Sequence, residues 1–197
     1  MSENWNEHAK NWDREDGVQF YAKQAFAVLI NHVNVYGNGW KSKRVLDFGC
    51  GTGLLAEKLA PLVGEVIAVD TSQKMIDVLH GKKIKNVTAI CADIDDRSVN
   101  SAAWCSDFDL IVASSVCGFL PDYEAMVDVL SQLLSVTGYL VQWDWLSSGD
   151  DGSGLTMDRI SNAFTRANLK CIHIDRAFEI PFGSEKMPVL MGVASAA

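Results

Sequence analysis

A run of glycines between two apolar stretches is the feature of this sequence that most directly indicates chemistry. Residues 45–53 read Val-Leu-Asp-Phe-Gly-Cys-Gly-Thr-Gly, and an apolar helical pattern begins at Leu54. Glycines at such a bend permit a sharp turn and the close approach of a ligand, because no Cβ stands in the way. The start of the following helix offers unpaired N–H groups. The motif therefore predicts a binding loop.

Three aspartates accompany this loop at the ends of predicted strands. Asp47 lies two positions before the first glycine, Asp70 ends the second strand, and Asp93 follows the third. A carboxylate at position 47 would repel a pyrophosphate and suits a ligand that carries positive charge. Asp70 is placed to accept the hydroxyls of a ribose, and Asp93 to accept an exocyclic amine. Two more aspartates follow Asp93 closely, so a solvated turn is the alternative for that cluster.

The spacing of the glycines distinguishes two classes of cofactor. Dinucleotide-binding loops have the pattern Gly-x-Gly-x-x-Gly, with the last glycine inside the helix. Here Leu54 occupies that position, and the third glycine is Gly53. An NAD(P)-dependent oxidoreductase is therefore the less favoured alternative.

An alternation of strands and helices positions these residues. The apolar patterns predict strands over residues 44–48, 65–70, 86–91, 108–113 and 139–145, and helices over 54–60, 72–80, 121–135 and 156–167. Two final strands, near 170–179 and 188–194, are too close in sequence for a crossover helix and should pair antiparallel. Strands without strict polar alternation indicate a parallel sheet covered on both faces. The sequence thus predicts a doubly wound α/β fold.

The N-terminal 43 residues precede this core and are rich in aromatic side chains. An apolar stripe predicts a helix over 18–36, with a capping start at Asp16 and a stop at Gly37. We therefore divide the chain into an N-terminal helical segment, 1–43, and a core, 44–197. A glycine- and serine-rich stretch, 147–154, predicts a mobile loop.

Composition excludes several classes of protein. The chain has 197 residues, 48% of them hydrophobic, and a formal net charge of −8. This favours one folded domain and gives no general attraction for nucleic acid. The 5 cysteines form no Cys-x-x-Cys pair, so we expect no metal site. The polar N-terminus and the lack of an apolar run of roughly 18 residues predict a cytoplasmic protein without a membrane span.

The glycine motif, together with Ala-Val-Asp-Thr-Ser at 68–72 and Phe-Asp-Leu-Ile-Val-Ala-Ser-Ser at 108–115, resembles the class I S-adenosylmethionine-dependent methyltransferases. The likeness extends from about Arg44 to the C-terminus. It implies a Rossmann-like, mostly parallel seven-stranded sheet in the order 3-2-1-4-5-7-6, with helices on both faces and only strand seven antiparallel. It also implies S-adenosylmethionine as cofactor and S-adenosylhomocysteine as product.

The resemblance assigns roles to individual residues. Asp47 would organise the loop and the methionine amine, Asp70 would take the ribose hydroxyls, and Asp93 would read the adenine edge. The residues 8–13 resemble a segment that covers the cofactor in similar family members. The implied cofactor-binding set is Asp47, Gly49, Gly51, Gly53, Asp70, Thr71, Met75, Asp93, Ile94, Ser114, Trp12 and Tyr21. Core packing is the alternative for Met75, and strand termination for Ser114.

Methyl transfer from a sulfonium is an in-line displacement that needs a base only when the acceptor must lose a proton. Candidates for such a base are Tyr21, Asp144 and His8, and no histidine stands at 117–119, where many family members carry one. The lack of long inserts and the many aromatic residues predict a small, partly apolar acceptor, handled by a monomer or homodimer. A non-catalytic protein that binds the same nucleoside is the alternative from another class.

Overall fold

The structure of the 197-residue chain is a computed structural model. It describes residues 5–94, 105–147, 154–182 and 185–197. Most of the loop predicted to be mobile, 147–154, lies outside these ranges, as do the two aspartates that follow Asp93 in the predicted solvated turn.

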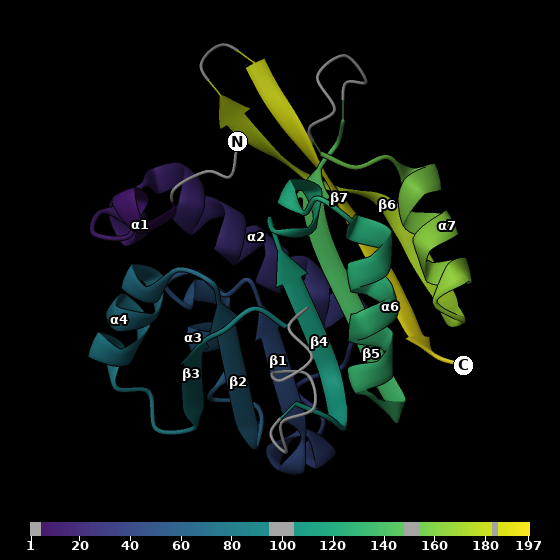
Figure 1. Ribbon diagram of the computed structural model, residues 1–197, viewed down its shortest axis with the longest axis horizontal. Helices are drawn as coiled ribbons and strands as arrows, with labels where there is room; N and C mark the ends of the chain where they lie inside the picture. The colour runs from purple at the N-terminus through teal and green to yellow at the C-terminus, as the bar shows by residue number, and fades with distance from the viewer. Residues whose placement is uncertain (1–4, 95–104, 148–153, 183–184) are drawn as a thin grey trace.

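A seven-stranded sheet forms the centre of the molecule (Figure 1). Its order is β3-β2-β1-β4-β5-β7-β6, and β7 runs antiparallel to both of its neighbours. The order and the single reversed strand confirm the fold expected from the sequence. The strands are β1 (Arg44–Phe48), β2 (Glu65–Asp70), β3 (Val87–Cys91), β4 (Phe108–Ser114), β5 (Leu134–Trp145), β6 (Leu169–Phe182) and β7 (Glu185–Ala196).

Helices cover the sheet on both faces, as buried apolar strands require. One core cluster lies between the sheet and α2 (Asp16–His32), α3 (Leu54–Leu59) and α4 (Gln73–Lys82). The other lies between the sheet and α6 (Tyr123–Leu133) and α7 (Met157–Arg166). In Figure 1, α6 and α7 lie on the near side of the strands and α2 passes behind them.

The predicted N-terminal helix is correct in kind but wrong at its ends. The helix α2 begins at Asp16, and its N-cap is Glu15, without a side-chain cap. It ends at His32 rather than near Gly37, because Val33 is already extended. Val33 and Val35 are both buried, at 2% and 1% exposed. Two residues separated by one position face the same side only in an extended chain, so burial of both valines ends the helix early.

The C-terminal strands are longer than the sequence suggested, and α6 ends two residues sooner. Leu134, expected in the helix, is extended and pairs with Phe108 across the sheet. Pro181 in β6 and Pro188 in β7 make strands harder to predict from the sequence there, because proline has no N–H to donate to a neighbouring strand. Pro181 is tolerated because β6 is an edge strand, and Pro188 because it lies one residue beyond the paired part of β5.

Within the described ranges, no helix has both the length and the apolar character needed to cross a bilayer.

Candidate functional site

The glycine loop between β1 and α3 forms the floor of a deep cavity. Gly49, Gly51 and Gly53 all have positive φ, at 67°, 54° and 81°. A Cβ at Gly49 would overlap the side chain of Val116, and one at Gly53 would overlap Leu79. The loop can take this path only with glycine at both positions, because L-residues avoid this backbone region even where space is free.

Asp47 lies under this loop and is almost completely buried, at 1% exposed. Its Oδ2 atom finds no hydrogen-bond partner among the described residues. Burial raises the pKa of Asp47 to about 7, against the opposing effect of the Ala56 backbone N–H, and the nearby Asp70 raises it further. A cationic group beside such a carboxylate would remove the cost of burying its charge.

Asp70 ends β2 and is held in a fixed orientation. Its Oδ2 accepts the N–H of Gly51 at 2.8 Å, and its Oδ1 accepts the N–H of Ser72 at 2.8 Å. Burial raises its pKa, and the backbone N–H bonds oppose that rise. The carboxylate therefore joins the end of β2 to the glycine loop, and its remaining lone pairs are available to hydroxyl donors in the cavity.

The cavity has a volume of about 1200 Å³, and most of the predicted cofactor residues line it. Residues from β1, β2, β4 and the turns after β2 and β3 meet there, as expected for the carboxyl edge of a doubly wound sheet. The predicted residues on its wall are Asp47, Gly49, Gly51, Asp70, Thr71, Met75, Asp93, Ile94, Ser114, Trp12 and Tyr21.

Gly53 is the predicted cofactor residue that is not on the wall of this cavity. It is instead the N-cap of α3, where its left-handed conformation starts the helix. Met75 and Ile94 are 2% and 1% exposed, so each both packs in the core and forms part of the cavity wall.

The three candidates for a catalytic base are placed differently. Tyr21 and His8 line the cavity, whereas Asp144 does not. Asp144 is fully buried and accepts the N–H of Cys117 at 3.1 Å and the N–H of Gly118 at 2.9 Å. Its carboxylate therefore fixes the turn η3 (Cys117–Phe119), and burial raises its pKa to about 7 despite these bonds.

Tyr21 lines the cavity, and its hydroxyl is buried. The residue is 7% exposed, and no described residue offers its hydroxyl a well-aligned hydrogen bond. Burial raises its pKa well above the usual range, the charge of Asp144 adds to the rise, and the nearby Ser115 hydroxyl opposes it. Tyr21 is thus a neutral phenol with hydrogen-bonding capacity to spare.

The N-terminal segment forms one side of the cavity wall, through α1 (Trp5–His8) and η1 (Trp12–Arg14). Asp13 accepts the hydroxyl of Thr52 from the glycine loop and pairs with Lys82 of α4 at 2.8 Å. Asn6 accepts the N–H of Lys74 at 3.1 Å, at the start of α4. The sequence assigned no role to Asp13 or Asn6, although Asp13 is the last residue of the segment 8–13 that carries the family resemblance.

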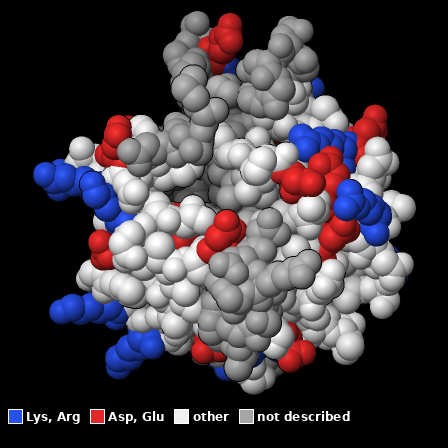
Figure 2. Space-filling view, viewed as in Figure 1, with Lys and Arg blue, Asp and Glu red and all other residues white. Residues whose placement is uncertain are grey.

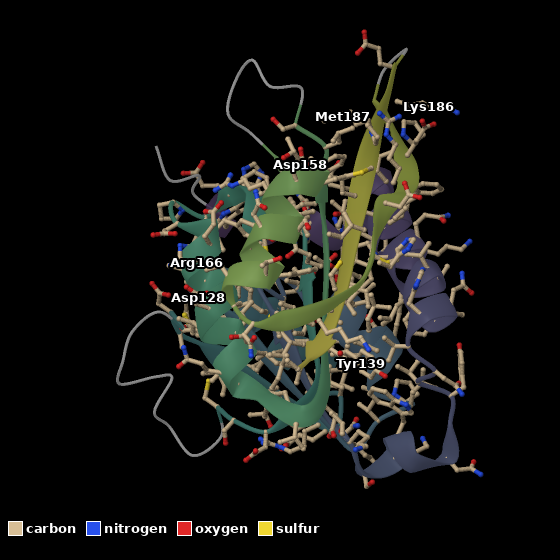
Figure 3. The ribbon with its side chains drawn as sticks, turned by 90° about the vertical axis from the view of Figure 1, so that its right-hand side faces the viewer. Asp128, Tyr139, Asp158, Arg166, Lys186 and Met187 are labelled. Carbon is tan, nitrogen blue, oxygen red and sulfur yellow. The ribbon has the colours of Figure 1, made fainter. Side chains whose placement is uncertain are left out.

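The β6–β7 hairpin and η3 complete the wall with apolar side chains. Ile180 and Met187 are paired across the hairpin and both line the cavity, as does Phe119. Figure 3 shows Met187 and Lys186 at the hairpin tip, far from Tyr139 at the other end of the sheet. Lys186 is the neighbour of Met187 in β7, and neighbouring residues in a strand face opposite sides. The Nζ atom of Lys186 lies 3.4 Å from Oε2 of Glu179.

A mostly parallel sheet with a glycine bend and a rim of carboxylates at its carboxyl edge is typical of α/β domains that bind a nucleoside. Residues 45–138 match the methyltransferase domain family. An uncharacterised methyltransferase of Schizosaccharomyces pombe is 32% identical over 126 residues, which are 59% of this chain and 44% of that protein. A malonyl-[acyl-carrier protein] O-methyltransferase of Bacillus cereus is 29% identical over 144 residues, 72% of this chain and 51% of that protein.

Among solved structures, the N-methyltransferase NodS of Bradyrhizobium japonicum, in complex with S-adenosyl-L-homocysteine, has a TM-score of 0.70 and 17% identity. The match covers 98% of this chain and 99% of that one. These matches support the resemblance to the class I S-adenosylmethionine-dependent methyltransferases that the sequence motifs indicated. The chain spans about half the length of the S. pombe and B. cereus relatives.

Proposed function

We propose that this chain binds S-adenosylmethionine and transfers its methyl group to a small, partly apolar acceptor. The observation that carries the proposal is the set of carboxylates around the glycine loop. A buried aspartate with an unused oxygen, Asp47, stands where a dinucleotide would need to place its diphosphate. This arrangement favours a nucleoside with a cationic amino-acid tail over one with an anionic linker.

The chain's own residues provide one place for each part of the cofactor. Asp47 and the loop glycines hold the methionine end, and Ser114 lies beside it on the wall. Asp70, fixed by two backbone N–H groups, accepts the ribose hydroxyls. Asp93 and Ile94 flank the adenine. The cofactor supplies an activated methyl group, so the protein mainly has to orient the acceptor and exclude water.

The N-terminal segment, 1–43, acts in this proposal as a cap on the core, 44–197. Trp12 and Tyr21 both reach the cavity from the cap, and the bonds of Asp13 hold the cap on the glycine loop. The relatives that match this chain are named as methyltransferases, which supports methyl transfer. The apolar side chains of the hairpin on the cavity wall suit an acceptor with a hydrophobic part. A cytoplasmic location and a monomeric or homodimeric state stay predictions from the sequence.

The proposal is tested by the ligands that stabilise the protein. S-adenosylhomocysteine at one hundred times its dissociation constant should add about 2.7 kcal/mol of stability. For a chain of this length that raises the melting temperature by roughly 5–10 °C, whereas NADH at the same concentration should leave it unchanged. Stabilisation by NADH alone would contradict the proposal. Production of S-adenosylhomocysteine with a panel of acceptors then separates an enzyme from a protein that only binds the nucleoside.

A further inference from the structure

The part of the cavity that the cofactor does not need is built from apolar side chains and one polar spot. Trp5, Phe119, Ile180 and Met187 come from the cap, η3 and the hairpin, and all line the cavity. Trp5 and Phe119 meet edge to face, with ring centroids 5.4 Å apart. These surfaces fit a ring-sized hydrophobic group.

The polar spot consists of the hydroxyls of Tyr21 and Ser115. Ser115 has a φ of 56°, an unusual value for a residue other than glycine, and its Oγ accepts the indole N–H of Trp145 at 3.1 Å. The Ser115 hydroxyl lies close to that of Tyr21, which has no well-aligned partner among the described residues. Both oxygens keep a lone pair that can accept an N–H group. The residue after Ser115 is Val116, which packs on Gly49, so the spot adjoins the methionine end of the cofactor site.

The charges around the cavity are of one sign. Its described wall includes five carboxylates and neither lysine nor arginine: Glu7, Glu15, Asp47, Asp70 and Asp93. Burial is the main cause of the raised pKa of Tyr21, and the negative charge of Asp144 adds to it. Lys82, close to the glycine loop, is engaged by Asp13 and Glu57 at 2.8 and 3.3 Å.

Figure 2 shows red side chains among white ones near the middle of this face, with blue side chains at its left margin and on its right-hand side. A carboxylate or phosphate acceptor would enter the cavity without a lysine or arginine partner on the described wall, at a cost in desolvation. A basic amine would be attracted instead.

We propose that the methyl acceptor is an amine attached to an apolar, ring-sized group, and that its nitrogen lies against the hydroxyls of Tyr21 and Ser115. The inference rests on the proposed function. The amine arrives as an ammonium ion and loses a proton to water as it meets the cationic sulfonium. Its lone pair then forms the N–CH3 bond while the S–CH3 bond breaks and its electron pair stays on sulfur. The resulting alkylammonium ion carries the positive charge, and no oxidant or reductant is required.

In this reaction Tyr21 is assigned to positioning the acceptor amine, neither as a base nor, as the family resemblance implied, as a cofactor-binding residue. Its raised pKa keeps the phenol neutral at physiological pH, so it holds the amine by hydrogen bonding and removes no proton.

The experiment compares three molecules that share a phenyl group and differ in the polar end: 2-phenylethylamine, 2-phenylethanol and 3-phenylpropanoate. Their binding to the complex of the protein with S-adenosylhomocysteine is measured by calorimetry, and S-adenosylmethionine turnover is measured in parallel. We expect the amine to bind at least about tenfold more tightly than the carboxylate, from the charge difference alone, and to be the one that is methylated. Preference for the carboxylate or the alcohol, or equal retention of all three, overturns the inference. Failure of S-adenosylhomocysteine itself to bind would instead overturn the proposed function.

Two sets of variants locate the effect. Tyr21→Phe should weaken amine binding by roughly fivefold through one lost hydrogen bond, with the affinity for S-adenosylhomocysteine changed less than twofold. An equal loss for both ligands would place Tyr21 in the cofactor site and contradict its role in positioning the amine. Glu7→Gln with Glu15→Gln should lower amine affinity by about threefold at low salt and less at high salt. Asp16→Asn, a neighbouring carboxylate that is not on the cavity wall, is the matched control and should change nothing.

Discussion

Two aspartates at the ends of neighbouring strands illustrate how environment decides the role of a residue. Asp70 has both carboxylate oxygens occupied by backbone N–H groups, so its position is fixed before any ligand arrives. Asp47 is more deeply buried and has one oxygen without a partner among the described residues. The first aspartate is a preorganised acceptor, and the second carries a cost of burial that a bound cation would relieve.

This contrast predicts that cofactor binding releases a proton. With a pKa of about 7 in the free protein, Asp47 is largely protonated at pH 6, and the ammonium group of the ligand should pull the pKa down. S-adenosylhomocysteine affinity should therefore rise by up to about tenfold per pH unit below pH 7 and level off above it. Calorimetry at pH 6 in buffers of different ionisation enthalpy should report close to one proton released, and Asp47→Asn should abolish the release. A binding enthalpy that is the same in every buffer would show that Asp47 loses no proton when the ligand binds.

At the level of elements, the cap is held on the core by polar contacts at both ends of α4. Asn6 binds the backbone at its start, and Asp13 pairs with Lys82 in its last turn while also binding Thr52. The cap has few buried side chains of its own before α2, with Ala9 its buried apolar residue in the described part. The docking of the part of the cap that precedes α2 therefore depends on these polar contacts and on the aromatic cluster of Trp5, His8 and Trp12.

We predict that Asp13→Ala loosens the cap without unfolding the core. Loss of the ion pair and of the hydroxyl bond should accelerate proteolytic cleavage within residues 5–20 and weaken S-adenosylhomocysteine binding by roughly three- to tenfold. Asp16→Ala, three residues further along the same segment, is the control and should leave both the cleavage rate and the affinity near those of the parent. Protection from cleavage that is unchanged in Asp13→Ala would mean that the aromatic cluster alone holds the cap.

The elements also show which features the sequence could predict. The glycine loop and the strand-end aspartates were predictable because tight turns and sheet edges depend on local residue types. The docking of Asn6 and Asp13 was not, because each partner lies dozens of positions away and no periodicity marks it. The early end of α2 has a similar origin, since the burial of Val33 and Val35 is set by the core and not by helix propensity. The cavity's apolar wall comes from a hairpin whose prolines obscured its length.

At the scale of the whole molecule, two buried carboxylates make the stability of the free protein depend on pH. The pKa values of Asp47 and Asp144 are both raised to about 7, above the value of roughly 3.9 of an unfolded aspartate. Between about pH 4 and pH 7 the folded state binds more protons than the unfolded state. These two groups therefore contribute stability at low pH that is lost as the pH rises through about 7.

The free energy of unfolding of the cofactor-free protein should accordingly decrease between about pH 4 and pH 7 through these two groups, by up to ~1.4 kcal/mol per pH unit for each. Urea unfolding at a series of pH values measures this free energy. Asp47→Asn should reduce its slope against pH by the contribution of one titrating group. Asp109→Asn, at the opposite end of the sheet where the carboxylate pairs with Lys43, is the comparison and should retain the full slope. A slope unaffected by Asp47→Asn would show that Asp47 is ionised when buried.

The position of β7 between β5 and β6 has a consequence for how the chain acquires its shape during synthesis. In the described sheet β6 has β7 as its strand neighbour, and β7 is translated last of the seven. When only residues up to 182 have emerged from the ribosome, β6 has no strand to pair with, and the edge of β5 that later pairs with β7 is exposed. The part of the cavity wall that the β6–β7 hairpin contributes can therefore form only after residues 185–196 have been synthesised. Until then the unpaired strand edges are exposed and can be bound by chaperones.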